Sequence, residues 1–192
     1  MMAEFVDTHC HLNSEALYQK IGQVLKEARD AGVTLFIVPG YDLATSKLAI
    51  EISHEYQEVY AAVGFHPTEI KNYGDAEYEW LEEAAKDPKV VAIGEIGLDY
   101  HWDTTTKEEQ EISFIRQMEI AKRVGKPVII HSRDANQDTF NLIAKYHGPE
   151  GGVMHSYAGS GEMALLYNKM GFFISPRIRM HNATFWTMIF SN

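Results

Sequence analysis

Short apolar runs recur seven times along the chain, and nearly every run ends in a histidine, a carboxylate or another polar group. Most of the runs are almost continuously apolar, which is typical of strands that are buried on both faces of a sheet. This pattern predicts seven buried strands. They cover residues 5–7, 35–39, 59–65, 90–95, 127–131, 152–155 and 171–175.

Between these runs, apolar residues recur three or four positions apart, as on the buried face of a helix. The first such stripe runs from Leu17 to Ala28 and stops at Gly32, and another covers residues 106–124 and stops at Gly125. Further helices are predicted around residues 48–56, 78–85, 139–146 and 162–170. Repeated strand–helix units favour a parallel sheet with helices outside, either closed as a barrel or open and doubly wound.

The polar ends of the strands decide between these two architectures. In a parallel barrel the carboxyl ends of all strands converge at one face, whereas an open sheet spreads them out. So many reactive groups at strand ends favour convergence, and therefore a TIM-type (β/α)₈ barrel of the α/β class. The chain has 192 residues, whereas such barrels usually have about 250. We therefore expect a single domain over residues 1–192, incomplete at the C-terminus, with about seven strands.

The composition limits which partners and compartments are expected. Lys and Arg total 17 against 27 Asp and Glu, so a net charge of −10 makes unaided phosphate binding unfavourable. Bound cations would then supply positive charge for a phosphate ester. Cys10 is the single cysteine, which suits a reducing compartment. No start resembling a signal peptide and no membrane-length apolar run is found, so we predict a cytoplasmic protein that does not enter the membrane.

Four histidines and one glutamate at the strand ends predict a metal site. His9 and His11 are separated by one residue, so on an extended strand both side chains point to one face and Cys10 points to the other. A lone histidine of this kind is more often a satisfied core residue than a ligand, but five such groups are hard to explain in that way. Mixed N and O ligands suit Zn²⁺, Mn²⁺ or related ions. The expected ligands are His9, His11, Glu95, His131 and His155.

Other polar groups at the strand ends are candidate substrate contacts, each with an alternative. His66 contacts substrate or fills the barrel mouth. Arg133 holds a phosphate or pairs with an acid such as Asp134. Tyr100 and Tyr157 stack against substrate, donate a hydrogen bond to it, or do neither.

Five successive motifs resemble those of the TatD deoxyribonuclease family: FVDTHCHL, VGFHP, GEIGLDY, PVIIHSRD and HSYAGS, in order between Phe5 and about Ser175. The resemblance implies a barrel of the metal-dependent hydrolase type with two divalent ions (Mg²⁺, Mn²⁺ or Zn²⁺). It implies cleavage of DNA phosphodiester bonds, often from the 3′ end of a single strand.

The resemblance also implies a role for each site residue. His9 and His11 would bind one ion, and His131 and His155 the other. Glu95 would bridge the two ions and is the catalytic residue. The residues expected near the substrate phosphate are His66, Tyr100 and Arg133.

After Ser175 the chain departs from the family pattern. The family continues to an eighth strand that ends in E-T-D, whose Asp completes the metal site. Residues 176–192 contain neither Asp nor Glu and form a tail unlike the family. We therefore expect an unclosed barrel with impaired turnover, and possible self-association through the open edges of its first and seventh strands.

Two other functions remain open from the sequence. One is a barrel amidohydrolase acting on a small amide or lactone. Such enzymes often carry a modified lysine at the fourth strand end, where this chain has Glu95, and Lys126 begins the fifth strand instead. The other is an inactive fragment that retains a partial metal site.

Overall fold

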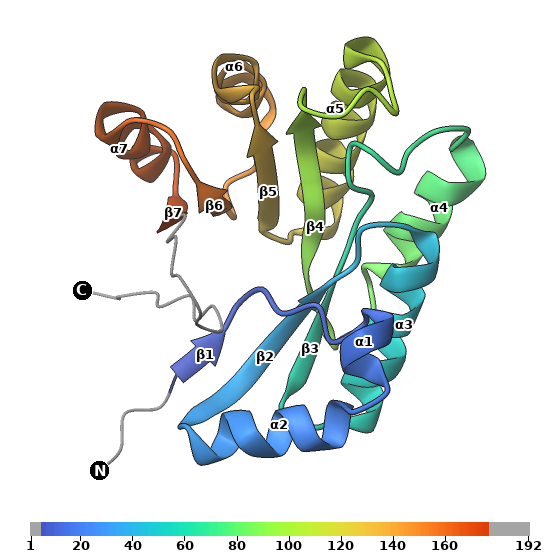
Figure 1. Ribbon diagram of the computed structural model, residues 1–192. Coiled ribbons are helices and arrows are strands. Elements are labelled where there is room, and N and C mark those ends of the chain that lie inside the picture. Colours follow the sequence, from blue (N-terminus) through green and yellow to red (C-terminus); the bar gives the residue numbers. More distant parts are fainter. Residues whose placement is uncertain (1–4, 177–192) are drawn as a thin grey trace.

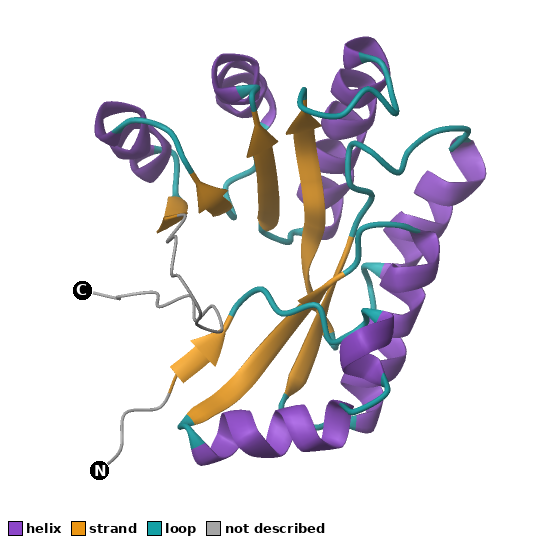
Figure 2. Cartoon of the chain, in the orientation of Figure 1, coloured by secondary structure: helices purple, strands orange, loops and turns teal. Residues whose placement is uncertain are grey.

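Seven parallel strands lie side by side in the computed structural model, which describes residues 5–176. The strands follow one another across the sheet in chain order, and the sheet curls into a half-barrel with the helices on its outer side (Figures 1 and 2). This confirms the predicted TIM-type architecture with seven strands. The strands are β1 (Phe5–Asp7), β2 (Val33–Pro39), β3 (Val59–Val63), β4 (Val90–Asp99), β5 (Val128–Arg133), β6 (Gly152–Tyr157) and β7 (Phe172–Pro176).

Helices connect the strands and cover the convex face of the sheet (Figure 2). Their buried side chains, among them Leu25, Ile52 and Phe114, pack with strand residues into the main core. Within residues 5–176 no helix has the length and apolar character that a membrane span requires. The helices are α1 (Glu15–Tyr18), α2 (Ile21–Asp30), α3 (Leu43–Glu55), α4 (Asp75–Ala84), α5 (Lys107–Val124), α6 (Asn136–Tyr146) and α7 (Gly161–Lys169).

Besides boundary shifts of a few residues in other elements, two differences from the sequence prediction bear on the fold. The first predicted helix is in fact two, because the chain turns at Gln19 and Lys20 and α1 buries no side chain of its own. The apolar stripe that anchors this region is therefore confined to α2. The second difference is β4, which continues four residues beyond Glu95 to Asp99 and pairs with β5 over that length.

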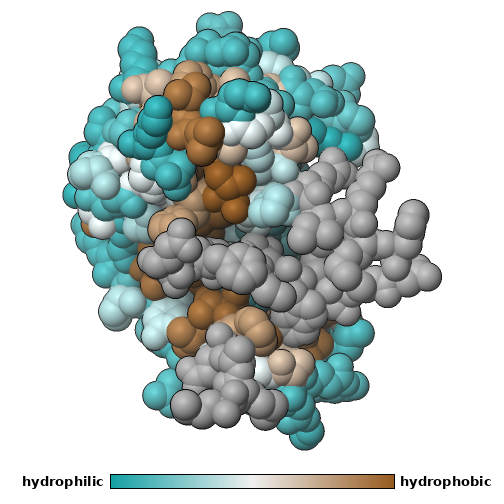
Figure 3. Space-filling model, turned by 90° about the vertical axis from the view of Figure 1, so that its left-hand side faces the viewer, coloured by the Kyte–Doolittle hydropathy of each residue, from teal (hydrophilic) through white to brown (hydrophobic). Residues whose placement is uncertain are grey.

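β1 and β7 end the sheet, since each pairs with one neighbour among the described strands. Exposed apolar side chains lie on both, including Phe5, Val6 and Phe173. Figure 3 views the molecule from this side and shows a band of hydrophobic residues there. An exposed apolar strand edge can pair with a strand of another chain. Self-association through these edges stays a prediction. The predicted tail, residues 176–192, lies outside the described residues except for Pro176.

Two buried glutamines on α5 fix the ends of β3 and β4. The side chain of Gln110 accepts a hydrogen bond from the Asp99 amide (2.9 Å) and donates to the Asp99 carbonyl (2.9 Å). Gln117, two turns further along α5, makes the same pair of bonds with Phe65, at 2.8 and 3.0 Å. Each glutamine therefore supplies the hydrogen-bond partners of a buried backbone N–H and C=O that do not pair with a neighbouring strand.

We expect Gln117→Leu to lower the free energy of unfolding by about 3 kcal/mol, because it leaves the buried amide and carbonyl of Phe65 unpaired, at a cost of about 1–3 kcal/mol each. Gln137→Leu is the matched control, since Gln137 is an exposed helical glutamine on α6 whose side chain bonds to Asn141, one turn along the same helix. Urea unfolding of the two variants and the parent measures the difference. Equal stability of the two variants would contradict this account.

Candidate metal centre

His9 and His11 lie in the loop that follows β1, with their Nε2 atoms 3.2 Å apart. The sequence argument placed them on an extended strand, whereas β1 ends at Asp7. The backbone still runs alongside β2 at this point, because the Cys10 amide donates to the Ile37 carbonyl (3.1 Å). The two imidazoles are therefore brought to one point, as predicted, while the Cys10 thiol packs against the core.

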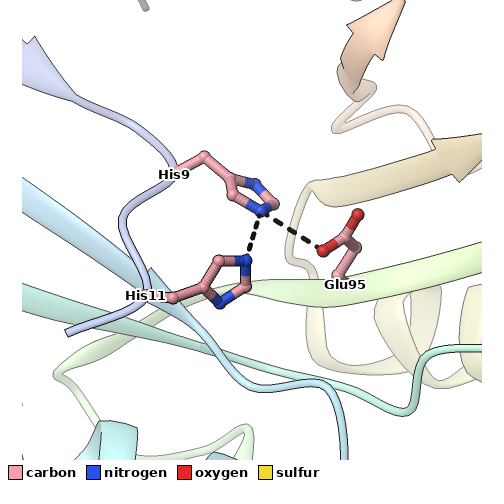
Figure 4. Close-up of side chains that lie close together, drawn as sticks. All are labelled: His9, His11 and Glu95. Carbon is pink, nitrogen blue, oxygen red and sulfur yellow. Dashed lines mark hydrogen bonds and ion pairs between the residues drawn. The ribbon is translucent and has the colours of Figure 1, made fainter. Parts of the chain in front are cut away.

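Glu95 on β4 faces this pair of histidines from across the sheet (Figure 4). Its side chain is buried, the residue being 5% exposed, and its Oε2 lies 3.2 Å from His9 Nε2. Its second oxygen, Oε1, lies 3.0 Å from His131 Nδ1 on β5. Burial alone would raise the pKa of Glu95, but the neighbouring His9 and His131 outweigh burial and hold the pKa well below its usual range.

His131 continues the cluster to a second buried carboxylate. Its Nε2 lies 2.8 Å from Asp99 Oδ2. Burial opposes protonation of His131, yet the hydrogen bonds with Asp99 and Glu95 raise its pKa to about 9. Both ring nitrogens of His131 therefore face a carboxylate oxygen, which favours the protonated imidazole.

Asp99 was not among the predicted site residues. It is 1% exposed and lies at the end of β4, held by Gln110. Positions 95 and 99 are an even number of residues apart on one strand, so their side chains share a face. A carboxylate at the end of an apolar run, in register with Glu95, was the signal that could have identified Asp99 from the sequence.

His155 and His66 each contact a histidine of the cluster. The His155 ring stacks on His9, with centroids 3.4 Å apart and planes 9° apart. Burial and then His9 lower the pKa of His155 to about 3. The His66 ring lies 4.2 Å from His131, and burial followed by His131 lowers its pKa to about 4. Both side chains are therefore neutral at physiological pH, as a metal ligand must be.

The donor atoms form two groups in the described part of the chain. One is His9, His11 and Glu95, and the other is His66, Asp99 and His131. The resemblance paired His131 with His155, whereas the structure brings His131 next to Asp99 and His155 next to His9.

The distances between donor atoms in the first group suit an ion with tetrahedral coordination. Ligands about 2.0–2.1 Å from Zn²⁺ lie roughly 3.3–3.4 Å from one another in tetrahedral geometry. His9 Nε2 lies 3.2 Å from both His11 Nε2 and Glu95 Oε2. Two imidazoles and a carboxylate also form a donor set that Zn²⁺ and Mn²⁺ accept. These residues fit a divalent ion, and with a second one at His131 and Asp99, Glu95 would lie between the two.

The side chains of Tyr100 and Arg133 interact with residues outside the cluster. The Tyr100 hydroxyl donates to Asp138 (3.0 Å), and the Lys107 ammonium lies over its ring. The Arg133 guanidinium lies 5.6 Å from the centre of the Trp102 ring. Within residues 5–176 Arg133 has no carboxylate partner, and Asp134 pairs with a histidine instead, so the alternative Arg133–Asp134 pair is not formed.

A curled parallel sheet that gathers histidines and buried carboxylates at the carboxyl ends of its strands defines a metal-dependent hydrolase of the TIM-barrel class. Comparison with known proteins gives the family. The profile described as TatD related DNase matches residues 6–183, and the chain belongs to this family. The match ends within the predicted tail, and residues 184–192 lie beyond it.

Members of this family are metal-dependent hydrolases, and some are named as nucleases. The uncharacterized metal-dependent hydrolase YabD of Bacillus subtilis is 41% identical over 171 residues, which cover 88% of this chain and 67% of YabD. The 3′-5′ ssDNA/RNA exonuclease TatD of Escherichia coli is 33% identical over 157 residues, which cover 81% of this chain and 60% of TatD. The chain thus spans between about three fifths and two thirds of the length of these relatives.

A solved structure confirms the fold. The TatD homologue YjjV of Escherichia coli superposes with a TM-score of 0.85 at 34% identity, over 91% of this chain and 68% of YjjV. A guanine deaminase from C. acetobutylicum, 13% identical with a TM-score of 0.56, shares the fold alone.

We expect Glu95→Ala to weaken Mn²⁺ or Zn²⁺ binding more than His66→Ala does. Glu95 faces donor atoms of both groups, whereas His66 belongs to the second group alone and also bonds to Thr68. Calorimetric titration of each variant with either metal measures the difference. Equal losses of affinity for the two variants would refute this assignment of roles.

Gly97, which lies between the two carboxylates on β4, should tolerate no side chain. Its φ is 143°, and a Cβ there would lie 2.0 Å from the His131 carbonyl. Gly97→Ala would force β4 away from β5, and we expect it to destabilise the fold by at least about 3 kcal/mol. Gly22→Ala on α2, where a Cβ meets nothing within 4 Å, is the control and should stabilise by up to about 1 kcal/mol. Thermal unfolding that ranks the two variants the other way would contradict the geometry.

Proposed function

We propose that this protein is a metal-dependent phosphodiesterase that cleaves single-stranded DNA from its 3′ end. The observation that carries the proposal is the position of Glu95, whose two oxygens face His9 on one side and His131 on the other. One carboxylate therefore joins two sets of donors, the arrangement that a two-ion site needs. The name of the exonuclease TatD of Escherichia coli supports single-stranded DNA as the substrate.

Two divalent ions, when bound, would polarise the phosphoryl group, activate water and stabilise the leaving oxygen. The residues proposed to hold them are His9, His11, Glu95, His131, His155 and Asp99. The remaining groups act on the substrate itself. His66 accepts a hydrogen bond from the Thr68 amide at Nδ1, so the neutral ring carries its proton on Nε2 and can donate to a phosphate oxygen. Arg133 can pair with the next phosphate. A cytoplasmic location accompanies the proposal and rests on the sequence argument.

The test is Mn²⁺-dependent cleavage of a single-stranded oligonucleotide labelled at its 5′ end. We expect stepwise shortening from the 3′ end at a rate below that of the relative, in line with the impaired turnover expected from the sequence, together with loss of activity in EDTA and a further drop of at least about 100-fold for Glu95→Gln. The exonuclease TatD of Escherichia coli is the positive control. Cleavage that survives in Glu95→Gln would point to a contaminating nuclease, and absence of cleavage while the relative is active would overturn the proposal.

The same preparation tests the amidohydrolase alternative with a panel of cyclic amides and lactones. Lys126 cannot serve as a metal-bridging lysine, because its ammonium bonds to the carbonyls of Asp87 and Val90 at the opposite end of β4. Turnover of an amide or lactone without cleavage of DNA would favour the alternative.

A further inference from the structure

A hollow of about 580 Å³ opens beside the candidate metal centre, in the region between the end of β4 and the start of α5. Asp99 belongs to both places, since it lines the hollow and also bonds to His131. A molecule that entered the hollow would therefore lie directly next to the metal centre. The hollow is lined by Lys71, Asp99, Tyr100, Trp102, Asp103, Lys107 and Glu109, together with three threonines and Gln110.

Trp102 exposes a large apolar ring on the wall of this hollow. The residue is 54% exposed, although an indole ring is usually withdrawn from water. The His101 ring meets Trp102 edge-on at 4.7 Å, and the Arg133 guanidinium lies over the ring at 5.6 Å. Trp102 thus presents an aromatic surface to solvent beside the metal centre.

The loop that carries Trp102 is bonded to the end of β4 and to the loop that follows β3. The Trp102 amide donates to Asp99 Oδ1 (3.3 Å). The hydroxyls of Thr104 and Thr105 donate to the carbonyls of Thr68 and Pro67, at 3.1 and 2.7 Å. These bonds fix the loop in place before any ligand arrives, so a partner that stacks on Trp102 does not have to order the loop.

The charges around the hollow favour an uncharged partner. Two ammonium groups, of Lys71 and Lys107, face three carboxylates, of Asp99, Asp103 and Glu109. A site with this balance does not attract a phosphate, in a chain whose net charge is already −10. A nucleobase is flat, uncharged and suited to stacking on an indole.

We propose that the hollow binds a base of the single-stranded substrate, stacked on Trp102, while the adjoining phosphate lies at the metal centre. Arg133 lies over the same ring and supplies a cation that could pair with a neighbouring phosphate. The inference rests on the proposed function for the identity of the ligand, but its test is a binding measurement that needs no turnover.

The experiment compares a fluorescently labelled single-stranded DNA with an abasic strand of the same length, in EDTA, by anisotropy titration. We expect the parent chain to bind the base-bearing strand at least about fivefold more tightly, and Trp102→Leu to remove this preference. Trp102→Tyr should retain most of it, because a phenol ring still stacks. Trp80→Ala is the control, since Trp80 also lies beside a lysine in a shallow hollow but belongs to α4 and to a different surface.

Equal binding of the two strands by the parent chain, or a preference that Trp102→Leu leaves intact, would overturn the base site. Equal losses in Trp102→Tyr and Trp102→Leu would also overturn it, because stacking would then not be the cause. The two proposals fail separately. A base preference that depends on Trp102, without metal-dependent cleavage, keeps the base site and rejects the activity, whereas cleavage without that preference does the reverse.

Discussion

A carboxylate that is almost completely withdrawn from water, that of Glu95, needs opposite charge or hydrogen-bond donors within about 3 Å, because an isolated buried charge is very costly. His9 and His131 supply these partners at 3.2 and 3.0 Å. The two histidines come from the loop after β1 and from β5, which are not neighbours in the sheet. The sheet must therefore curl for all three groups to meet. Burial of Glu95 and the half-barrel shape depend on each other.

The scaffold beneath this cluster is built to keep the end of β4 in place. Asp99 is held by Gln110 of α5 and in turn holds His131, so a helix on the outside of the sheet fixes a side chain at its carboxyl end. Gly97 permits β4 to approach the His131 carbonyl closely between the two carboxylates. Metal sites depend on such supporting contacts, because they set the orientation of each ligand.

Much of this fold was predictable because parallel strands, buried on both faces, appear in a sequence as continuous apolar runs. All seven predicted strands are found. The convergence of His9, His11 and Glu95 was also predictable from their places at strand ends, although a loop, and not strand alternation, brings the histidines together. Their role as ligands remains a prediction.

Three features could not be predicted by the same reasoning, because they depend on tertiary contacts. Glycines follow residue 93, and glycines are typical of the end of a strand. β4 nevertheless continues to Asp99, because it pairs with β5 over that length. The stacking of His155 on His9 comes from the curl of the sheet, which brings β6 towards the β1 loop. Trp102 has no periodic pattern around it, so only the structure shows that its ring faces a hollow beside the site.

The most direct test of the central claim is a crystal structure of the protein grown with Mn²⁺ or Zn²⁺, with the ions located by anomalous scattering. The account predicts an ion about 2.0–2.2 Å from His9 Nε2, His11 Nε2 and Glu95 Oε2, with a second anomalous peak beside His131 and Asp99. A structure determined at saturating metal would contradict the account if Glu95 bonded only to the His9 and His131 imidazoles and no anomalous peak lay between these side chains.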